Sequence, residues 1–242
     1  EVAMAYTYLD LTNEVLARFN EVTLTSSGFG SSRGFQTQCK NAINDSYLYL
    51  NSRQFTWPFN HSDKSETLVA NTPRYSIPTD AKWVDHDTFR ITKNSSLGAQ
   101  GGALSVLDYK DYLEQYIDSE DDTGTAAYPR HVVRTPDNNY LVYPMPDKAY
   151  ELNYEYYINT TVLTAATDVP IIPEQFRQTL IDGATAYGYQ YRGEKDQFSI
   201  NWNRFEDGIK HMRIQLINND EYIRSTVITR SGVSNASGAR LT

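Results

Sequence analysis

One apolar seam near the C-terminal end of the chain constrains the fold more than any other feature. Its residues follow one another at steps of 4, 3, 4, 3 and 4, which is the spacing of one helix face. The seam consists of Phe198, Trp202, Phe205, Ile209, Met212 and Leu216. Because a face this regular must be covered by other helices, we expect these residues to hold a helical bundle, or its subunits, together.

Helical spacing occurs at both ends of the chain. It predicts helices over about 10–21, 34–53, 173–192 and 196–217. Asp10 or Thr12 can cap the first, whose apolar face extends to Val22. Pro173 suits the first turn of the third helix, and Gly193 can end it.

The middle of the chain has β patterning instead. Strands are predicted over 67–77, 83–92, 131–133, 140–143 and 150–158, and residues 104–117 predict a strand that enters a short helix over 109–116. The strand at 150–158 alternates most strictly, so one of its faces should be buried. We therefore predict an α+β fold: a four-helix bundle interrupted by a β-rich insertion, with an extended C-terminal tail. The expected parts are 8–60 and 166–220 for the bundle, 61–165 for the insertion and 221–242 for the tail.

Composition excludes several classes of protein. Hydrophobic residues make up 40% and charged residues 21% of the chain, as in globular domains. No apolar run approaches the roughly 18 residues of a membrane span, and the N-terminus lacks a signal core. The net charge is −8 without a Lys/Arg cluster, which argues against binding to nucleic-acid phosphates. The lone Cys39 favours an intracellular origin and should be a small buried hydrophobe.

No motif predicts catalysis, a cofactor or a metal site. In an EF-hand register beginning at Asp118, the sixth residue is Thr123 instead of Gly and the twelfth is Pro129 instead of Glu. The four histidines lack metal-ligand spacing. His86 lies between Asp85 and Asp87, but in a strand it points away from both, so a strand-edge position is favoured over acid–base chemistry.

The 19 tyrosines leave two interpretations of the β region open. Trp83, Tyr154 or Tyr156 could stack on sugars, as in a glycan-binding module. Aromatic strand residues are more often core or subunit interface.

An ordered series of short segments resembles the head-to-tail adaptor proteins of tailed phages, especially the tail tubular protein A type. No single motif is diagnostic, but the series covers nearly the whole chain. The segments are SSRGFQ at 31–36, AIN at 42–44, WPFNH at 57–61, YSIPTD at 75–80, WVDHDTF at 83–89, YPMPDKAY at 143–150, YEYY at 154–157, IPEQF at 172–176, FEDGI at 205–209, MR at 212–213 and LIN at 216–218.

The resemblance implies a structural virion protein at the head–tail junction, made in the host cytoplasm, with no enzyme activity. Such adaptors form a ring of twelve copies below the portal protein and extend the DNA channel, through which DNA passes without specific binding. The ring docks the nozzle or next tail component, a role we expect for Trp83, Tyr154 and Tyr156. The residues expected to dock the portal are Arg224, Ile228, Arg230, Arg240 and Leu241.

Two other functions stay open at this stage. One is a glycan-binding module on the tail surface. The other is a peptidoglycan hydrolase, because some relatives with this bundle cut cell-wall material. No pair of carboxylates in the sequence is placed for that reaction.

Overall fold

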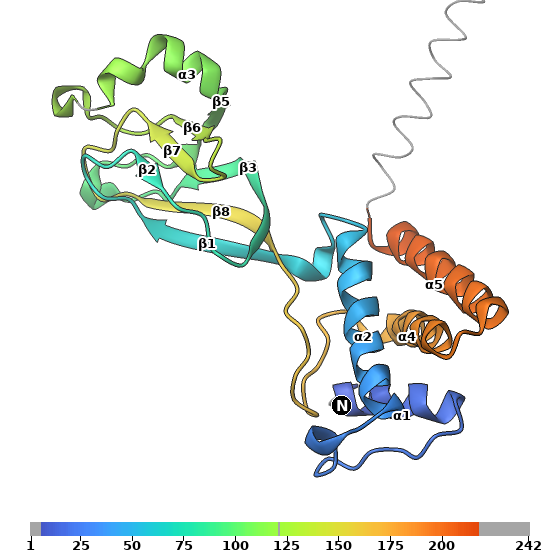
Figure 1. Cartoon of the computed structure of the whole chain (residues 1–242). Coiled ribbons are helices and arrows are strands. Elements are labelled where there is room, and N and C mark those ends of the chain that lie inside the picture. Colours follow the sequence, from blue (N-terminus) through green and yellow to red (C-terminus); the bar gives the residue numbers. More distant parts are fainter. Residues whose placement is uncertain (1–5, 121, 218–242) are drawn as a thin grey trace, which may run out of the picture. The chain divides into compact units, whose positions relative to one another are not determined.

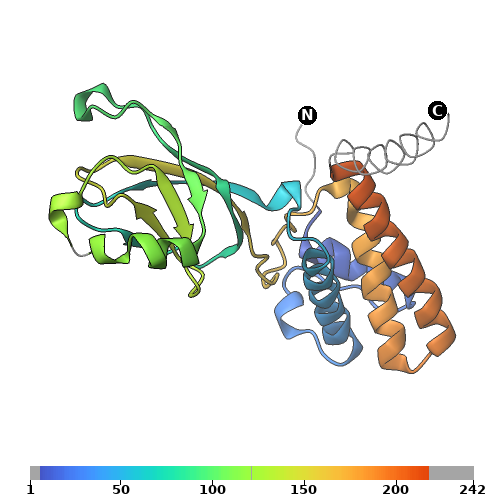
Figure 2. The same ribbon diagram turned by 90° about the horizontal axis from the view of Figure 1, so that it is seen from above.

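The structure is a computed structural model that describes residues 6–120 and 122–217. The chain divides into two compact units, and the divisions fall between Phe59 and Asn60 and between Asn159 and Thr160. One unit is helical and contains both ends of the described chain, whereas the other is built mainly of strands (Figures 1 and 2). The fold is therefore a mixture of α and β structure, as predicted.

The helical unit contains helices α1 (Tyr8–Arg18), α2 (Phe35–Ser52), α4 (Arg177–Arg192) and α5 (Lys195–Leu216). Short 3-10 turns at Phe29–Ser31 and Glu174–Phe176 precede α2 and α4. Helices α4 and α5 lie side by side in Figure 2, and α1 lies across α2 in Figure 1. The described helices thus pack as a crossed cluster, and a regular four-helix bundle stays a prediction.

Helix α1 begins earlier than predicted, and its cap is Thr7 instead of Asp10 or Thr12. The Thr7 hydroxyl accepts the Asp10 backbone N–H at 3.2 Å, and the Asp10 carboxylate accepts the Thr7 backbone N–H at 2.9 Å. This reciprocal capping box satisfies two amides that the first turn would otherwise leave unpaired. Because α1 ends at Arg18, Val22 lies beyond it and is 77% exposed, so the predicted apolar face was too long.

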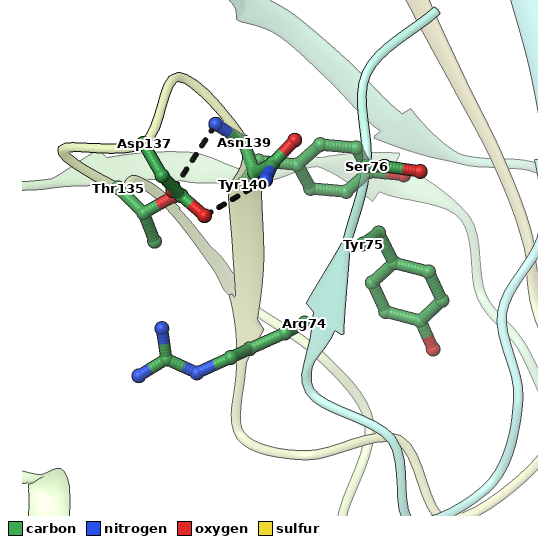
Figure 3. Close-up of a pocket in the computed structure, with 7 residues that line it drawn as sticks. All are labelled: Arg74, Tyr75, Ser76, Thr135, Asp137, Asn139 and Tyr140. Carbon is green, nitrogen blue, oxygen red and sulfur yellow. Dashed lines mark hydrogen bonds between the residues drawn. The ribbon is translucent and has the colours of Figure 1, made fainter.

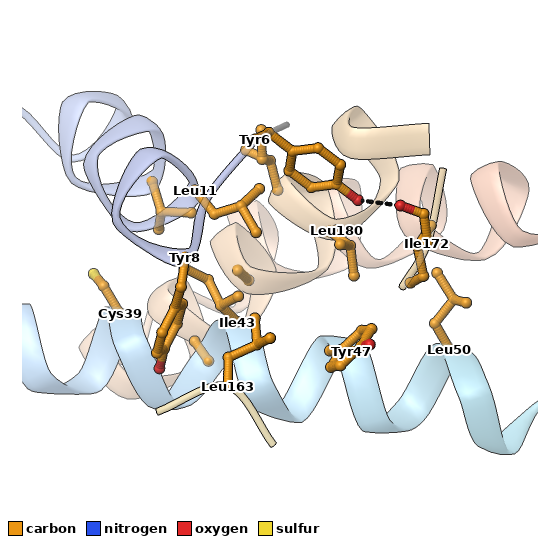
Figure 4. Close-up of a cluster of buried hydrophobic side chains, with 14 of the residues drawn as sticks. Tyr6, Tyr8, Leu11, Cys39, Ile43, Tyr47, Leu50, Leu163, Ile172 and Leu180 are labelled. Carbon is orange, nitrogen blue, oxygen red and sulfur yellow. Dashed lines mark hydrogen bonds between the residues drawn. The ribbon is translucent and has the colours of Figure 1, made fainter. Parts of the chain in front are cut away.

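Helix α2 agrees with its predicted stripe. Cys39, Ile43, Tyr47 and Leu50 recur on one face and are all buried (Figure 4). Beyond α2, the unit's core takes in Tyr6, whose hydroxyl donates to the Ile172 carbonyl at 2.7 Å. The continuous apolar face is what ties α1, α2 and α4 together.

Helix α4 uses small residues to let its neighbours approach. A Cβ at Gly183 would lie 2.9 Å from the Phe205 ring of α5 and 2.9 Å from the Ser46 hydroxyl of α2. Gly193 ends the helix in the left-handed conformation, at φ 78°, as predicted for a C-terminal glycine.

The second boundary of the insertion lies before residue 165. Leu163 is buried in the core of the helical unit, and its backbone N–H donates to Asn44 Oδ1 at 2.9 Å. The sequence places no Pro or helix start there, so only tertiary contacts reveal where the helical unit resumes.

The β unit contains two four-stranded sheets. One has the order β1–β8–β3–β4 and the other β2–β7–β6–β5. The elements are β1 (His61–Thr67), β2 (Arg74–Tyr75), β3 (Ala81–Ile91), β4 (Gly102–Ala103), β5 (Ser105–Leu107), α3 (Tyr109–Gln115), β6 (His131–Arg134), β7 (Tyr140–Tyr143) and β8 (Glu151–Ile158). The pairings are antiparallel except that of β5 with β6, which is parallel.

Most of the predicted strands are confirmed, including β6 and β7, which pair with each other, and the succession of β5 and α3. The strand predicted over 67–77 is wrong. Its place is taken by β1, which ends at Thr67, and by the two-residue β2. Strand β1 has the polar sequence HSDKSET and so lacks an apolar alternation, but its backbone is fully paired with β8. Pairing with a neighbour, which is a tertiary property, made this segment a strand.

Candidate functional site

The α5 seam is partly internal to the helical unit. Phe205, Ile209 and Met212 are buried in its core. Trp202 and Leu216 are half-buried against that core, and Phe198 stacks on Trp202 with ring centroids 5.6 Å apart. The middle of the seam is therefore covered by other helices of the same chain. Subunit packing stays a prediction for its partly exposed ends.

Three ion pairs join the segment around α1 to α4. The Arg18 guanidinium donates to Asp182 at 2.7 Å, and Arg192 donates to Glu21 at 2.6 Å. Arg177 pairs with Glu14 through two of its nitrogens, Nε and Nη2. These pairs orient α1 on α4 and add little stability, because each is partly exposed to solvent.

A second polar contact joins α2 to α5. Glu206 accepts hydrogen bonds from the Tyr49 hydroxyl at 2.5 Å and from Arg53 at 2.8 Å. Burial raises the pKa of Glu206, but the bonds from Tyr49 and Arg53 outweigh it and the net pKa lies below the usual value. Burial, together with the Glu206 carboxylate, raises the pKa of Tyr49 to about 12. The folded state therefore favours the ionised form of the Glu206 carboxylate.

Cys39 is fully buried, and burial raises the pKa of its thiol to about 12. A thiol that resists ionisation is a poor nucleophile, so the predicted packing role is confirmed.

Two of the three aromatic residues expected to dock a tail component are in the core of the β unit. Tyr154 is 1% exposed and stacks on Phe89 at 4.5 Å, and Tyr156 is 7% exposed. Their rings cannot reach a partner, which corrects that expectation and also removes them as a sugar platform. Trp83 is 38% exposed on the opposite face of its sheet, beside Tyr157.

His86 is not placed for acid–base chemistry at the surface. Its Nδ1 lies 3.1 Å from the Val84 carbonyl and its ring stacks on Phe89. Burial lowers the pKa of the imidazole, which keeps it neutral near pH 7. The register of β3 against β8 shifts between Asp85 and Arg90, in the stretch that contains His86.

A pocket of about 220 Å³ lies between β2 and the turn that joins β6 to β7 (Figure 3). Several polar side chains that line it already have partners in the protein. Asp137 accepts from the Thr135 hydroxyl and from Asn139, and Arg74 forms an ion pair with Glu120. The bonds from Thr135 and Asn139 lower the pKa of Asp137. The bonds of Asp137 stabilise the turn between β6 and β7.

In the two described ranges, no group of three or more His, Cys, Asp and Glu side chains is arranged to hold a metal ion. None of the helices in those ranges combines the length and apolar composition that a bilayer crossing needs. The expected portal-docking residues lie outside the described residues. They are Arg224, Ile228, Arg230, Arg240 and Leu241.

Comparison with known families decides the identity of the chain. The family model described as SU10 adaptor protein matches residues 6–230, which span both units. The chain belongs to the SU10 adaptor protein family. A search of curated proteins found no match. The adaptor is accordingly a structural component of a phage virion that interacts with other head or tail components.

Sequence reasoning missed part of the adaptor's exposed β surface. Tyr157 lies beside Trp83 there and His61 lies beyond Tyr157, but His61 belongs to a strand that the sequence does not predict. An alternation of exposed and half-buried residues along β1 exists only because β8 lies beside it.

Proposed function

We propose that the adaptor forms a ring of twelve copies below the portal, extends the DNA channel and docks the nozzle or next tail component. The observation that carries this proposal is the family match over residues 6–230, because it includes the helical unit and the β unit together. The order of elements supports the tail tubular protein A type of adaptor.

In this proposal the helical units stack side by side around the ring. The partly exposed ends of the α5 seam, Phe198 and Leu216, would face neighbouring copies. The net charge of −8 suits a channel wall, because an acidic wall repels DNA and lets it pass without specific contacts.

The C-terminal residues 221–242 are proposed to dock the portal. The sequence there contains Arg224, Arg230 and Arg240 against the single acidic residue Glu221. Its basic side chains thus outnumber its acidic ones.

Electron microscopy of the adaptor mixed with the portal from the same genome tests the proposal. A ring of adaptor on the portal, with a continuous central channel, is the expected result. Free adaptor beside bare portals at micromolar concentrations of both would refute it.

Glycan binding is a second candidate because Trp83 offers an exposed ring beside Tyr157. Screening the protein on a glycan array tests this second candidate. Binding that disappears in Trp83→Ala would favour it, and an array without signal would remove it.

A further inference from the structure

The outer face of the β1–β8–β3 sheet carries two unlike rows of side chains. Because the strands are in register, residues directly opposite one another form lines across the sheet. We name them the aromatic row, His61–Tyr157–Trp83, and the acidic row, Asp63–Glu155–Asp85. The rows are two residues apart along each strand, so they are neighbours on one face.

The aromatic row is a continuous surface of ring contacts. The centroids of His61 and Tyr157 are 5.6 Å apart, and those of Tyr157 and Trp83 are 5.7 Å apart. Trp83 remains 38% exposed. Most other aromatic side chains of this sheet, such as Tyr154 and Phe89, are buried on its inner face. An exposed row of rings is the type of surface that proteins use to bind a partner.

Repulsion within the acidic row destabilises the protein when no partner is bound. Like charges directly opposite each other on neighbouring strands are destabilising, and here three carboxylates share one line. Glu155 has a partial partner in His61, at 3.1 Å, and Asp85 accepts the Asp87 backbone N–H. Within the described residues, the Asp63 side chain has neither a hydrogen bond nor an ion pair, although its backbone pairs with β8.

The cation nearest in register does not compensate for this charge. Arg90 is opposite Asn153, one row further along the same face. In the described part of the chain it forms no ion pair with the acidic row. The face therefore combines exposed rings with two aspartates, Asp63 and Asp85, that form no ion pair in the described part of the chain.

We propose that this face binds an arginine-bearing segment of the tail component that the adaptor docks. The inference rests on the proposed function and names the chemistry of its partner. A guanidinium group can lie flat on Trp83 or Tyr157 while its N–H groups donate to Glu155 or Asp85. Arginine fits better than lysine, because it is planar, presents five donors and is more weakly hydrated.

A small probe tests the chemistry of the face in the full-length protein. N-acetyl-arginine amide is titrated while NMR follows the Trp83 indole N–H, which is assigned with Trp83→Phe. The expected result is a saturable shift that N-acetyl-lysine amide reproduces about three- to ten-fold more weakly. Absence of a shift, equal responses to both amides, or a shift caused only by N-acetylglucosamine would overturn the proposal.

Substitutions in the acidic row identify the carboxylates that take part. Glu155→Gln combined with Asp85→Asn should weaken binding of the arginine amide about ten-fold, which corresponds to roughly 1.4 kcal/mol. Glu151→Gln is the matched control, because Glu151 lies on the same face of β8 but bonds Ser65 at 2.8 Å, away from both rows. Equal loss in the control would show a diffuse charge effect and overturn the site.

An assembly experiment distinguishes failure of this inference from failure of the proposed adaptor role. Portal rings loaded with each variant are mixed with the next tail component and imaged. Normal rings that lose the tail component only with the acidic-row variant support the inference. Normal rings that dock it equally well with every variant overturn it. If the wild-type protein forms no ring, the proposed function fails, and the amide titration still decides whether the face binds arginine.

Discussion

Replacement of Gly183 by Ala tests the packing of the helical unit most directly. The new Cβ would lie 2.9 Å from Phe205 Cε2 and 2.9 Å from Ser46 Oγ, which is closer than real Cβ contacts. Phe205 is fully buried with Tyr49 and Trp202 against its ring, so it has little room to move. The substitution therefore pushes α4 away from α5 and α2 at this point.

Two opposing effects set the magnitude. Alanine is favoured over glycine inside a helix by about 1 kcal/mol. Overpacking a dense core costs about 1–3 kcal/mol, and the contact here involves a fixed ring and a hydroxyl that already bonds the Ala42 carbonyl. We expect a net destabilisation of about 1–2 kcal/mol, because the steric cost exceeds the gain in helix propensity.

Urea unfolding followed by far-UV circular dichroism measures this change. Gly30→Ala is the control, because nothing lies within 4 Å of a Cβ at that position. In a Phe205→Leu background the cost of Gly183→Ala should fall by at least about 1 kcal/mol, because the smaller side chain vacates the contact. A variant stabilised by the full propensity gain, or strictly additive effects in the double variant, would refute the steric reasoning.

The remaining predictions concern the cap, a carboxylate and the tail. Thr7→Ala should destabilise the helical unit by about 1 kcal/mol in urea unfolding through loss of the capping box, whereas Thr23→Ala at an exposed loop position should cost less. Glu206 has a lowered pKa, so its stabilising contribution is present above its unfolded pKa and is lost as the pH falls through the folded value. Thermal unfolding between pH 6 and pH 3 should show a smaller loss in Glu206→Gln than in the wild type, and parallel curves would contradict this. Deletion of residues 225–242 should leave the circular dichroism of the described helices unchanged but weaken attachment to the portal in a pull-down, and unchanged attachment would refute a docking role for that segment.

The helices could be located from sequence because their signals are local. The α5 seam, the α2 stripe and Gly193 each depend on residues a few positions apart, and all three agree with the structure. The start of α1 was missed because the choice among Thr7, Asp10 and Thr12 depends on which side chain accepts a backbone N–H of the first turn. The structure shows that Thr7 and Asp10 cap one another.

The β unit was harder to predict, because its strands depend on neighbours distant in sequence. Strand β1 is polar throughout, and pairing with β8, about ninety residues away, holds it. The alternation of β8 predicted one buried face correctly, and Tyr154 and Tyr156 were on it. Their expected role in docking was incompatible with that same alternation.

By itself, the sequence determined the type of fold, the order of elements and the resemblance to phage adaptors, because local periodicity and short ordered segments carry that information. Only the tertiary structure decided where the helical unit resumes, that Trp83 instead of Tyr154 or Tyr156 is exposed, and which residues lie beside it. The aromatic and acidic rows come from strands that the chain separates widely. Strand register places their members opposite one another, and register follows from pairing across the whole sheet.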